Sequence, residues 1–272
     1  MSTTVQHPAP GHVQVAPVTQ ARVLRSEWIK MRSLRSTTIT LLAAVVAMIA
    51  LAWLVGWATN DHWNHMDPGE RANFNAIDRS LAGVNLAQLA IGVLGVLLIS
   101  GEYATGMIRA TLSAVPRRLP VLWAKSGLFA AVTFVLMLVS SFLAFVIGQH
   151  FLASHGTTLS APHAWRAIFG TAGYLTLIAV LAVAFGFAIR STAGGIAALF
   201  GLLLVIPGVG QLLPASWQIH TLPYLPSNAG SAIYSAHPDP TALSPGTGLL
   251  VLLLWVAVSL AAAAVLLTRR DA

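Results

Sequence analysis

The stretch that decides the fold is residues 126–148, SGLFAAVTFVLMLVSSFLAFVIG, which contains no Lys, Arg, Asp or Glu. Wound as an α-helix at about 1.5 Å per residue, a segment of this length crosses a hydrocarbon core of about 30 Å. Its apolar residues run continuously and do not alternate with a period of two, which favours a helix over a barrel strand. The stretch therefore predicts a membrane-spanning helix.

Five more stretches of this kind occur along the chain, and only 8% of all residues are charged. A soluble domain carries about 25% charged residues, so a water-soluble fold is excluded. We predict one all-α membrane domain over residues 21–272. Residues 1–20 are uncharged and rich in Pro, which predicts a disordered tail. The six predicted spans are 38–59, 81–100, 126–149, 167–189, 193–213 and 246–267.

The distribution of basic residues between the loops predicts the orientation. Twelve of the 15 Lys and Arg lie on one side of the predicted spans, and three lie on the other. Cytoplasmic loops are enriched in Lys and Arg, so both termini are predicted to be inside the cell, in the plasma (inner) membrane. The twelve are Arg22, Arg25, Lys30, Arg32, Arg35, Arg109, Arg117, Arg118, Lys125, Arg190, Arg269 and Arg270.

Several function classes find no support in the residues. The net charge of +7 is spread over the ends of the spans, so we expect no nucleic-acid partner. The chain has no Cys, and the spacing of its His residues matches no metal-ligand pattern, so we expect no metal site. The middles of the spans carry no charge, which argues against a proton-coupled carrier. Asn85 and Gln88 share a helix face, where they either line a translocation route or bond to a neighbouring helix.

Two cytoplasmic segments are predicted to form amphipathic helices. Wound over residues 103–115, the first places Thr105, Arg109 and Ser113 on one polar line, and Pro116 ends it. Such a helix either rests on lipid headgroups or contacts another protein. The second, residues 23–35, is predicted to lie at the membrane surface. We also expect Glu102, at the inner end of the second span, to pair with a cation that the sequence does not name.

Two features are predicted on the outer side. Pro207 is expected to kink or break the fifth span, because proline interrupts the helical hydrogen bonds. The Pro-rich stretch 214–245 is long for a bare loop, so we expect short helices in it. Its apolar residues either cap a translocation route or are buried against the bundle.

These segments resemble the permease subunits of type-2 ATP-binding-cassette (ABC) exporters. In that family a Glu closes the second span and is followed by Gly, a short helix, Pro, basic residues and a Lys at the third span. The chain shows this order in Glu102, Gly106, Pro116, Arg117, Arg118 and Lys125. The opening segment 26–36 is similar to the entry helix of actinobacterial members, and residues 223–230 resemble the outer segment before the last span.

The resemblance implies a half-channel that pairs with a second permease copy or paralogue and with a separate ATPase subunit. The helix over 103–115 would be the coupling helix seated on that ATPase. The chain has no G-x-x-x-x-G-K-[ST] phosphate loop, so ATP and Mg would be held by the partner, and the chain itself would not be an enzyme. A stand-alone carrier or facilitator and a membrane anchor that moves nothing remain alternatives. The residues implied in coupling are Glu102, Thr105, Gly106, Arg109, Ser113, Pro116, Arg117 and Arg118.

Overall fold

The computed structural model describes residues 19–237 and 241–270. The described residues form helices joined by short loops and contain no strand. Within these two described ranges, six helices are long and apolar enough to cross a membrane, which confirms the predicted all-α fold. They are α2 (Arg35–His62), α5 (Val84–Ala104), α7 (Leu119–Leu152), α8 (Ala164–Ile189), the interrupted helix Thr192–Gly210 and α13 (Pro245–Arg269). Of the predicted tail, only Thr19 and Gln20 lie among the described residues.

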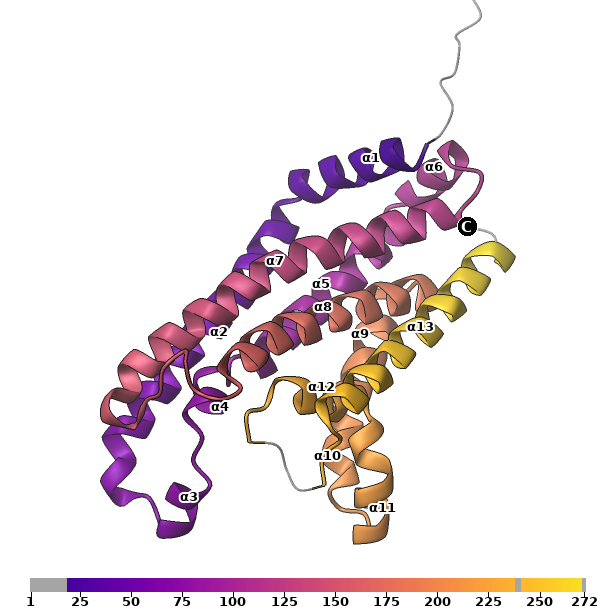
Figure 1. Cartoon of the computed structure of the whole chain (residues 1–272). Helices are drawn as coiled ribbons and strands as arrows, with labels where there is room; N and C mark the ends of the chain where they lie inside the picture. The colour runs from indigo at the N-terminus through magenta and orange to yellow at the C-terminus, as the bar shows by residue number, and fades with distance from the viewer. Residues whose placement is uncertain (1–18, 238–240, 271–272) are drawn as a thin grey trace, which may run out of the picture.

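Helix α8 forms the centre of the bundle. It packs against α5, α7 and α13 (Figure 1). In the most apolar segment of α8, 67% of the residues are buried, whereas in that of α13 only 17% are. Helix α13 therefore lies at the edge of the bundle, where it would meet lipid.

Small residues allow α5 and α8 to approach each other closely. A Cβ added at Gly95 would lie 2.6 Å from the Cβ of Ala182 and 3.0 Å from the carbonyl oxygen of Ala179. On the other side of the interface, a Cβ added at Gly186 would lie 2.9 Å from the Cβ of Ile99. Helices in lipid gain their association energy from such close packing, so these glycines help to hold the bundle together.

Two spans differ from a plain helix of the predicted length. The fifth consists of α9 (Thr192–Phe200), a π turn η3 (Gly201–Val205) and α10 (Ile206–Gly210). Pro207 cannot donate a backbone hydrogen bond, and the π turn interrupts the regular ladder just before it, as predicted. The third span begins at Leu119 and not near residue 126, because Pro120 favours the first helical turn. Lys125 therefore lies inside α7.

The two ends of the bundle differ in character (Figure 1). One end carries α1 (Gln20–Ser33), α6 (Met107–Ala114), the start of α7 and the last turn of α13, and we call it the basic end. The other end, the loop end, carries the remaining short helices. They are η1 (Trp63–His65), α3 (Pro68–Ala72), α4 (Ala76–Ser80), η2 (Ala153–His155), α11 (Ala215–Thr221), η4 (Leu222–Tyr224) and α12 (Pro226–Tyr234).

The short helices predicted in the Pro-rich stretch are confirmed as α11, η4 and α12. Their apolar residues divide into two groups. Leu222 and Leu225 are buried, whereas Trp217, Ile219 and Tyr224 are exposed. This stretch is therefore only partly buried against the bundle, and the exposed side chains are free to enter the membrane interface.

Candidate functional site

The turn between α5 and α6 lies at the basic end. Helix α5 ends at Ala104, and the Thr105 hydroxyl donates to the Gly101 carbonyl at 2.9 Å. Gly106 then adopts a left-handed conformation with φ +72°, which a residue with a side chain adopts only with strain. This turn redirects the chain, so α6 begins as a separate helix at Met107.

This break corrects the predicted helix over 103–115. Tyr103 and Thr105 belong to the end of α5 and its cap, and only Met107–Ala114 form α6. The physical reason is Gly106, whose positive φ interrupts the regular helix. Thr105 therefore does not share a helical line with Arg109 and Ser113, although all three are exposed.

Helix α6 presents one face to the bundle and the other to solvent or a partner. Ile108 and Leu112, one turn apart, are 2% and 8% exposed and anchor the helix to the bundle. Arg109 follows Ile108 in the sequence, Ser113 follows Leu112, and both are exposed. The helix is thus fixed from beneath by apolar contacts and leaves a polar face uncovered.

Four charged side chains meet next to α6, and we call them the charge cluster: Glu27, Lys30, Glu102 and Lys125. The Lys125 ammonium lies 2.5 Å from Oε2 of Glu27 and 2.8 Å from Oε1 of Glu102. The Lys30 ammonium lies 2.9 Å from Oε1 of Glu27 and 3.2 Å from Oε1 of Glu102, the oxygen that Lys125 also contacts. The cluster therefore joins α1, α5 and α7 at one point.

The cluster also reaches α6 directly. Lys30 donates a third hydrogen bond to the hydroxyl of Thr111 at 3.1 Å. Burial by itself would lower the pKa of Lys30, but the hydrogen bond with Glu27 and the charges of Glu102 and Glu27 outweigh it and raise that pKa above its usual value. Lys30 is thus held charged while it links α6 to α1 and α5.

The deep burial of this cluster makes it costly to disturb. Glu27, Glu102 and Lys125 are 4%, 9% and 6% exposed. Removing one partner of a buried ion pair costs about 3–5 kcal/mol, because the remaining charge loses its compensation. The expected cation partner of Glu102 is therefore a pair, Lys30 and Lys125.

Sequence reasoning did not single out Glu27 and Lys30 as site residues. The sequence pattern groups Leu24, Trp28 and Met31 on one apolar face of the first helix, but in the structure Leu24 and Trp28 are exposed and only Met31 is buried. The buried face is Val23, Glu27 and Met31, which follow each other at intervals of four. That spacing, with one acid in an otherwise apolar row, was the available signal for a buried charge.

The other residues implied in coupling divide between two roles. Gly106, Pro116 and Arg117 are exposed near α6. Arg118 instead donates to the carbonyls of Leu267 and Arg270 at 3.0 and 2.9 Å. A cation suits the C-terminal end of a helix, where carbonyl groups lack partners. Arg118 therefore ties the start of α7 to the end of α13.

Arg190 acts at the same place from the end of α8. Its guanidinium donates to the Arg270 carbonyl at 3.3 Å and lies 5.0 Å from the ring of Tyr103. Together with Arg118 it connects the basic ends of α5, α7, α8 and α13.

The structure separates Asn85 from Gln88. Gln88 is buried and accepts a short hydrogen bond from the Tyr174 hydroxyl of α8, which is the helix-to-helix role left open above. Asn85 is exposed and lines a polar cavity of about 370 Å³ at the loop end. The two residues therefore face different surroundings.

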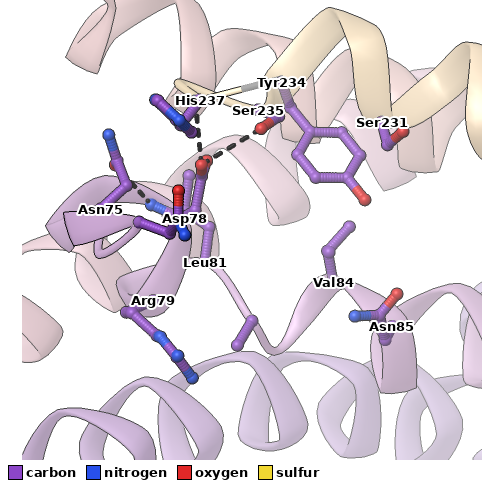
Figure 2. A pocket seen from close by; sticks show the side chains of 12 residues that line it. Asn75, Asp78, Arg79, Leu81, Val84, Asn85, Ser231, Tyr234, Ser235 and His237 are labelled. Atoms are coloured by element: carbon purple, nitrogen blue, oxygen red, sulfur yellow. Dashed lines mark hydrogen bonds between the residues drawn. The ribbon is translucent and has the colours of Figure 1, made fainter. Parts of the chain in front are cut away.

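Asp78 organises that cavity at the loop end (Figure 2). Its carboxylate accepts hydrogen bonds from the Ser235 hydroxyl at 3.1 Å and from the backbone N–H groups of Ala236 and His237 at 2.7 and 3.0 Å. Burial, with a smaller effect of the Asp78 charge, raises the pKa of Tyr234. Asp78 thus fastens the chain after α12 onto α4.

The histidines at the loop end do not gather into a site. The ring of His155 stacks on Trp63 with centroids 3.7 Å apart. Among residues 19–237 and 241–270, no group of three His, Asp or Glu side chains is placed to hold a metal ion.

Comparison with known families connects this arrangement to transport. The model of a family described as "ABC-2 family transporter protein" matches residues 23–208. The chain belongs to this family. The ABC-2 match extends from α1 to α10 and so includes the charge cluster and α6. The chain is therefore a membrane component of an ABC transporter. A comparison with curated proteins found no match.

Proposed function

We propose that this ABC-2 family chain is the permease subunit of an ATP-driven exporter and that α6 is its contact with a separate ATPase subunit. The observation that carries the proposal is the way in which α6 is mounted. Ile108 and Leu112 hold it to the bundle, and Lys30 joins its Thr111 to the charge cluster. A force applied to α6 is thereby passed to α1, α5 and α7 together.

The chemistry of ATP hydrolysis belongs to the partner. The sequence has no phosphate loop, so ATP and Mg would be bound by the ATPase. Closure of the ATPase on nucleotide would move α6 and, through Glu102 and Lys125, the basic ends of α5 and α7. Such a step requires different contacts with the ATPase in its two states, and nucleotide binding supplies that difference.

The proposed arrangement in the cell follows from the charge distribution. The basic end, with α6 and both ends of the described chain, lies on the cytoplasmic side of the plasma membrane. A second copy or a paralogue would complete the translocation route, because one chain supplies one half of it.

The test is capture of the ATPase from native membranes by the tagged full-length chain. Arg109→Glu reverses the charge on the exposed face of α6, whereas Arg25→Glu makes the same change on exposed α1. We expect Arg109→Glu to lower the amount of captured phosphate-loop protein at least tenfold and Arg25→Glu to leave it unchanged. Equal capture by Arg109→Glu and the wild-type chain would contradict the role of α6. Capture of no phosphate-loop ATPase by the wild-type chain would favour a stand-alone carrier or an anchor.

A further inference from the structure

Helix α1 lies across the basic end of the bundle and is held there along one face (Figure 1). At its start, the side-chain amide of Gln20 donates to the Pro120 carbonyl in the first turn of α7 at 3.2 Å. Near its middle, Glu27 pairs with Lys125 of α7 at 2.5 Å. Val23, between these two contacts, is buried. One face of α1 is thus fixed to the bundle, and the opposite face is presented outward.

The outer face of α1 carries only positive charge. Glu27 is the one acidic residue of the helix, and it is buried in the charge cluster. Arg25 and Arg32 are exposed and lie about two turns apart on the same side of the helix. Arg35 is exposed at the start of α2, and we call these three residues the arginine strip. Their guanidinium groups form no hydrogen bond or ion pair with residues 19–237 or 241–270, so the strip offers three unpaired cations to an anionic partner.

Apolar side chains accompany the arginine strip. Trp28 lies three residues after Arg25 and four before Arg32, a spacing that places it on the same side of the helix. Trp28 and Leu24, one turn before it, are both exposed. Tryptophan is enriched where lipid headgroups meet hydrocarbon, and the apolar stem of an arginine lets its charged group reach the headgroups from there. The outer face therefore fits a partner that is anionic at its surface and apolar beneath, as a lipid layer is.

The corner between α1 and α2 indicates where the acyl chain of such a lipid would lie. Arg35 is followed on one face of α2 by Ile39, Leu42 and Val46, at spacings of four, three and four residues. All four residues are exposed, so the described chain leaves this face of the first span open to lipid. Arg35 stands at the end of the row that is nearest to the basic end. A lipid whose acyl chain lies along the row therefore has its headgroup beside Arg35 and Arg32.

We infer that the arginine strip binds the phosphate groups of anionic membrane lipids, with an acyl chain along Ile39, Leu42 and Val46. A guanidinium can donate two parallel hydrogen bonds to one phosphate. A zwitterionic lipid carries the same phosphate together with an ammonium group that the arginines repel, so it binds less tightly. Binding requires neither the ATPase nor a second permease copy, and its failure would leave the proposed coupling through α6 untouched.

A fluorophore on α1 can report which lipid occupies the site. The chain has no Cys, so Ala21→Cys creates a single labelling position, exposed and one turn before Arg25 on the same side of the helix. The labelled full-length chain is placed in nanodiscs with phosphatidylglycerol or phosphatidylcholine that carries a nitroxide near the top of an otherwise identical acyl chain. Quenching by each lipid gives the ratio of their binding constants. We expect phosphatidylglycerol to bind at least tenfold more tightly.

Two single substitutions test whether the arginine strip is responsible for this preference. Arg32→Gln should lower it about fivefold, the effect of one basic residue near an anionic surface. Arg117→Gln removes the same charge from an exposed position at the basic end outside α1 and should leave the preference unchanged. Replacement of Arg25, Arg32 and Arg35 together by Gln should abolish it. Because none of these three guanidinium groups has a partner in the described chain, all variants should fold, which their unfolding midpoints check.

The dependence on salt and three contrary results complete the test. Added salt should lower the preference of the wild-type chain, because it screens exposed charges. Equal quenching by the two lipids would overturn the inference. An equal loss of preference in Arg32→Gln and Arg117→Gln would also overturn it, since only the overall charge of the basic end would then matter. Absence of quenching by either lipid would show that water or a second copy of the chain covers this face, and it would overturn the inference as well.

Discussion

Lys30 of α1 and Thr111 of α6 are joined by a hydrogen bond of 3.1 Å, although they lie far apart in the sequence. The same ammonium pairs with Glu27 and Glu102, so one side chain connects the proposed ATPase contact to the buried charges of the bundle. This connection gives α6 a path to the spans other than the short turn at Gly106.

Loss of that hydrogen bond should reduce coupling more than stability. In Thr111→Val the side chain keeps its size but loses the acceptor for Lys30, and a bond to a charged group contributes about 1.5–3 kcal/mol. We expect the Thr111→Val permease to change the ATPase activity of its captured partner less than the wild-type permease does. Thr268→Val, in the exposed last turn of α13, is the matched control. ATPase activity identical in the two variants would refute the link.

Removal of the Lys125 ammonium should destabilise the whole bundle. Lys125→Met leaves Glu27 and Glu102 with one cation between them in a buried place, at a cost of about 3–5 kcal/mol. Thermal unfolding in detergent should show a clearly lower midpoint. Arg32→Met, a change at an exposed position of α1, should leave the midpoint within error of the wild type. Similar midpoints for the two variants would show that the cluster adds little.

The close contact of α5 with α8 predicts a difference between two glycines. Gly95→Ala places a Cβ 2.6 Å from that of Ala182, and such overpacking costs about 1–3 kcal/mol. At Gly173 in α8 an added Cβ meets nothing within 4 Å, so Gly173→Ala should be neutral or slightly stabilising. Unfolding midpoints measured side by side check the prediction, and an unchanged midpoint for Gly95→Ala would contradict the packing.

Asp78 should control local opening at the loop end. Asp78→Ala removes the acceptor of Ser235, Ala236 and His237, so the amides of Ala236 and His237 should exchange their hydrogens faster. Asp67→Ala removes a carboxylate from an exposed loop-end residue with little effect expected. Hydrogen exchange followed by mass spectrometry measures how fast the amides of Ala236 and His237 exchange. Unchanged protection after Asp78→Ala would show that other contacts hold it.

The proposed orientation can be tested with single cysteines, because the chain has none of its own. Ser113 on α6 and Asn64 at the loop end are both exposed. In intact cells a membrane-impermeant maleimide should label Asn64→Cys and should label Ser113→Cys only after the membrane is opened. Labelling of position 113 from outside intact cells would reverse the orientation.

Much of the fold is readable from the sequence alone. Residues 126–148 and the five similar stretches predict six spans, because uncharged segments of that length are stable only in lipid. Pro207 and the prolines after residue 213 predict the interrupted fifth span and the short helices that follow it. The order of Glu102, Gly106, Pro116 and Lys125 indicates the family, and the family match agrees with it.

Tertiary structure decided which of these residues act together. The sequence shows Glu27, Lys30, Glu102 and Lys125 in three separate segments, and only the packing of α1 against α5 and α7 brings their charges within 2.5–3.2 Å. It also turned Arg118 toward α13 and separated Asn85 from Gln88. Hydropathy determines which segments enter the membrane, because the free energy of inserting a segment into lipid depends on the composition of that segment by itself. The pairing of charges depends on distances between segments, and these exist only once the helices have packed.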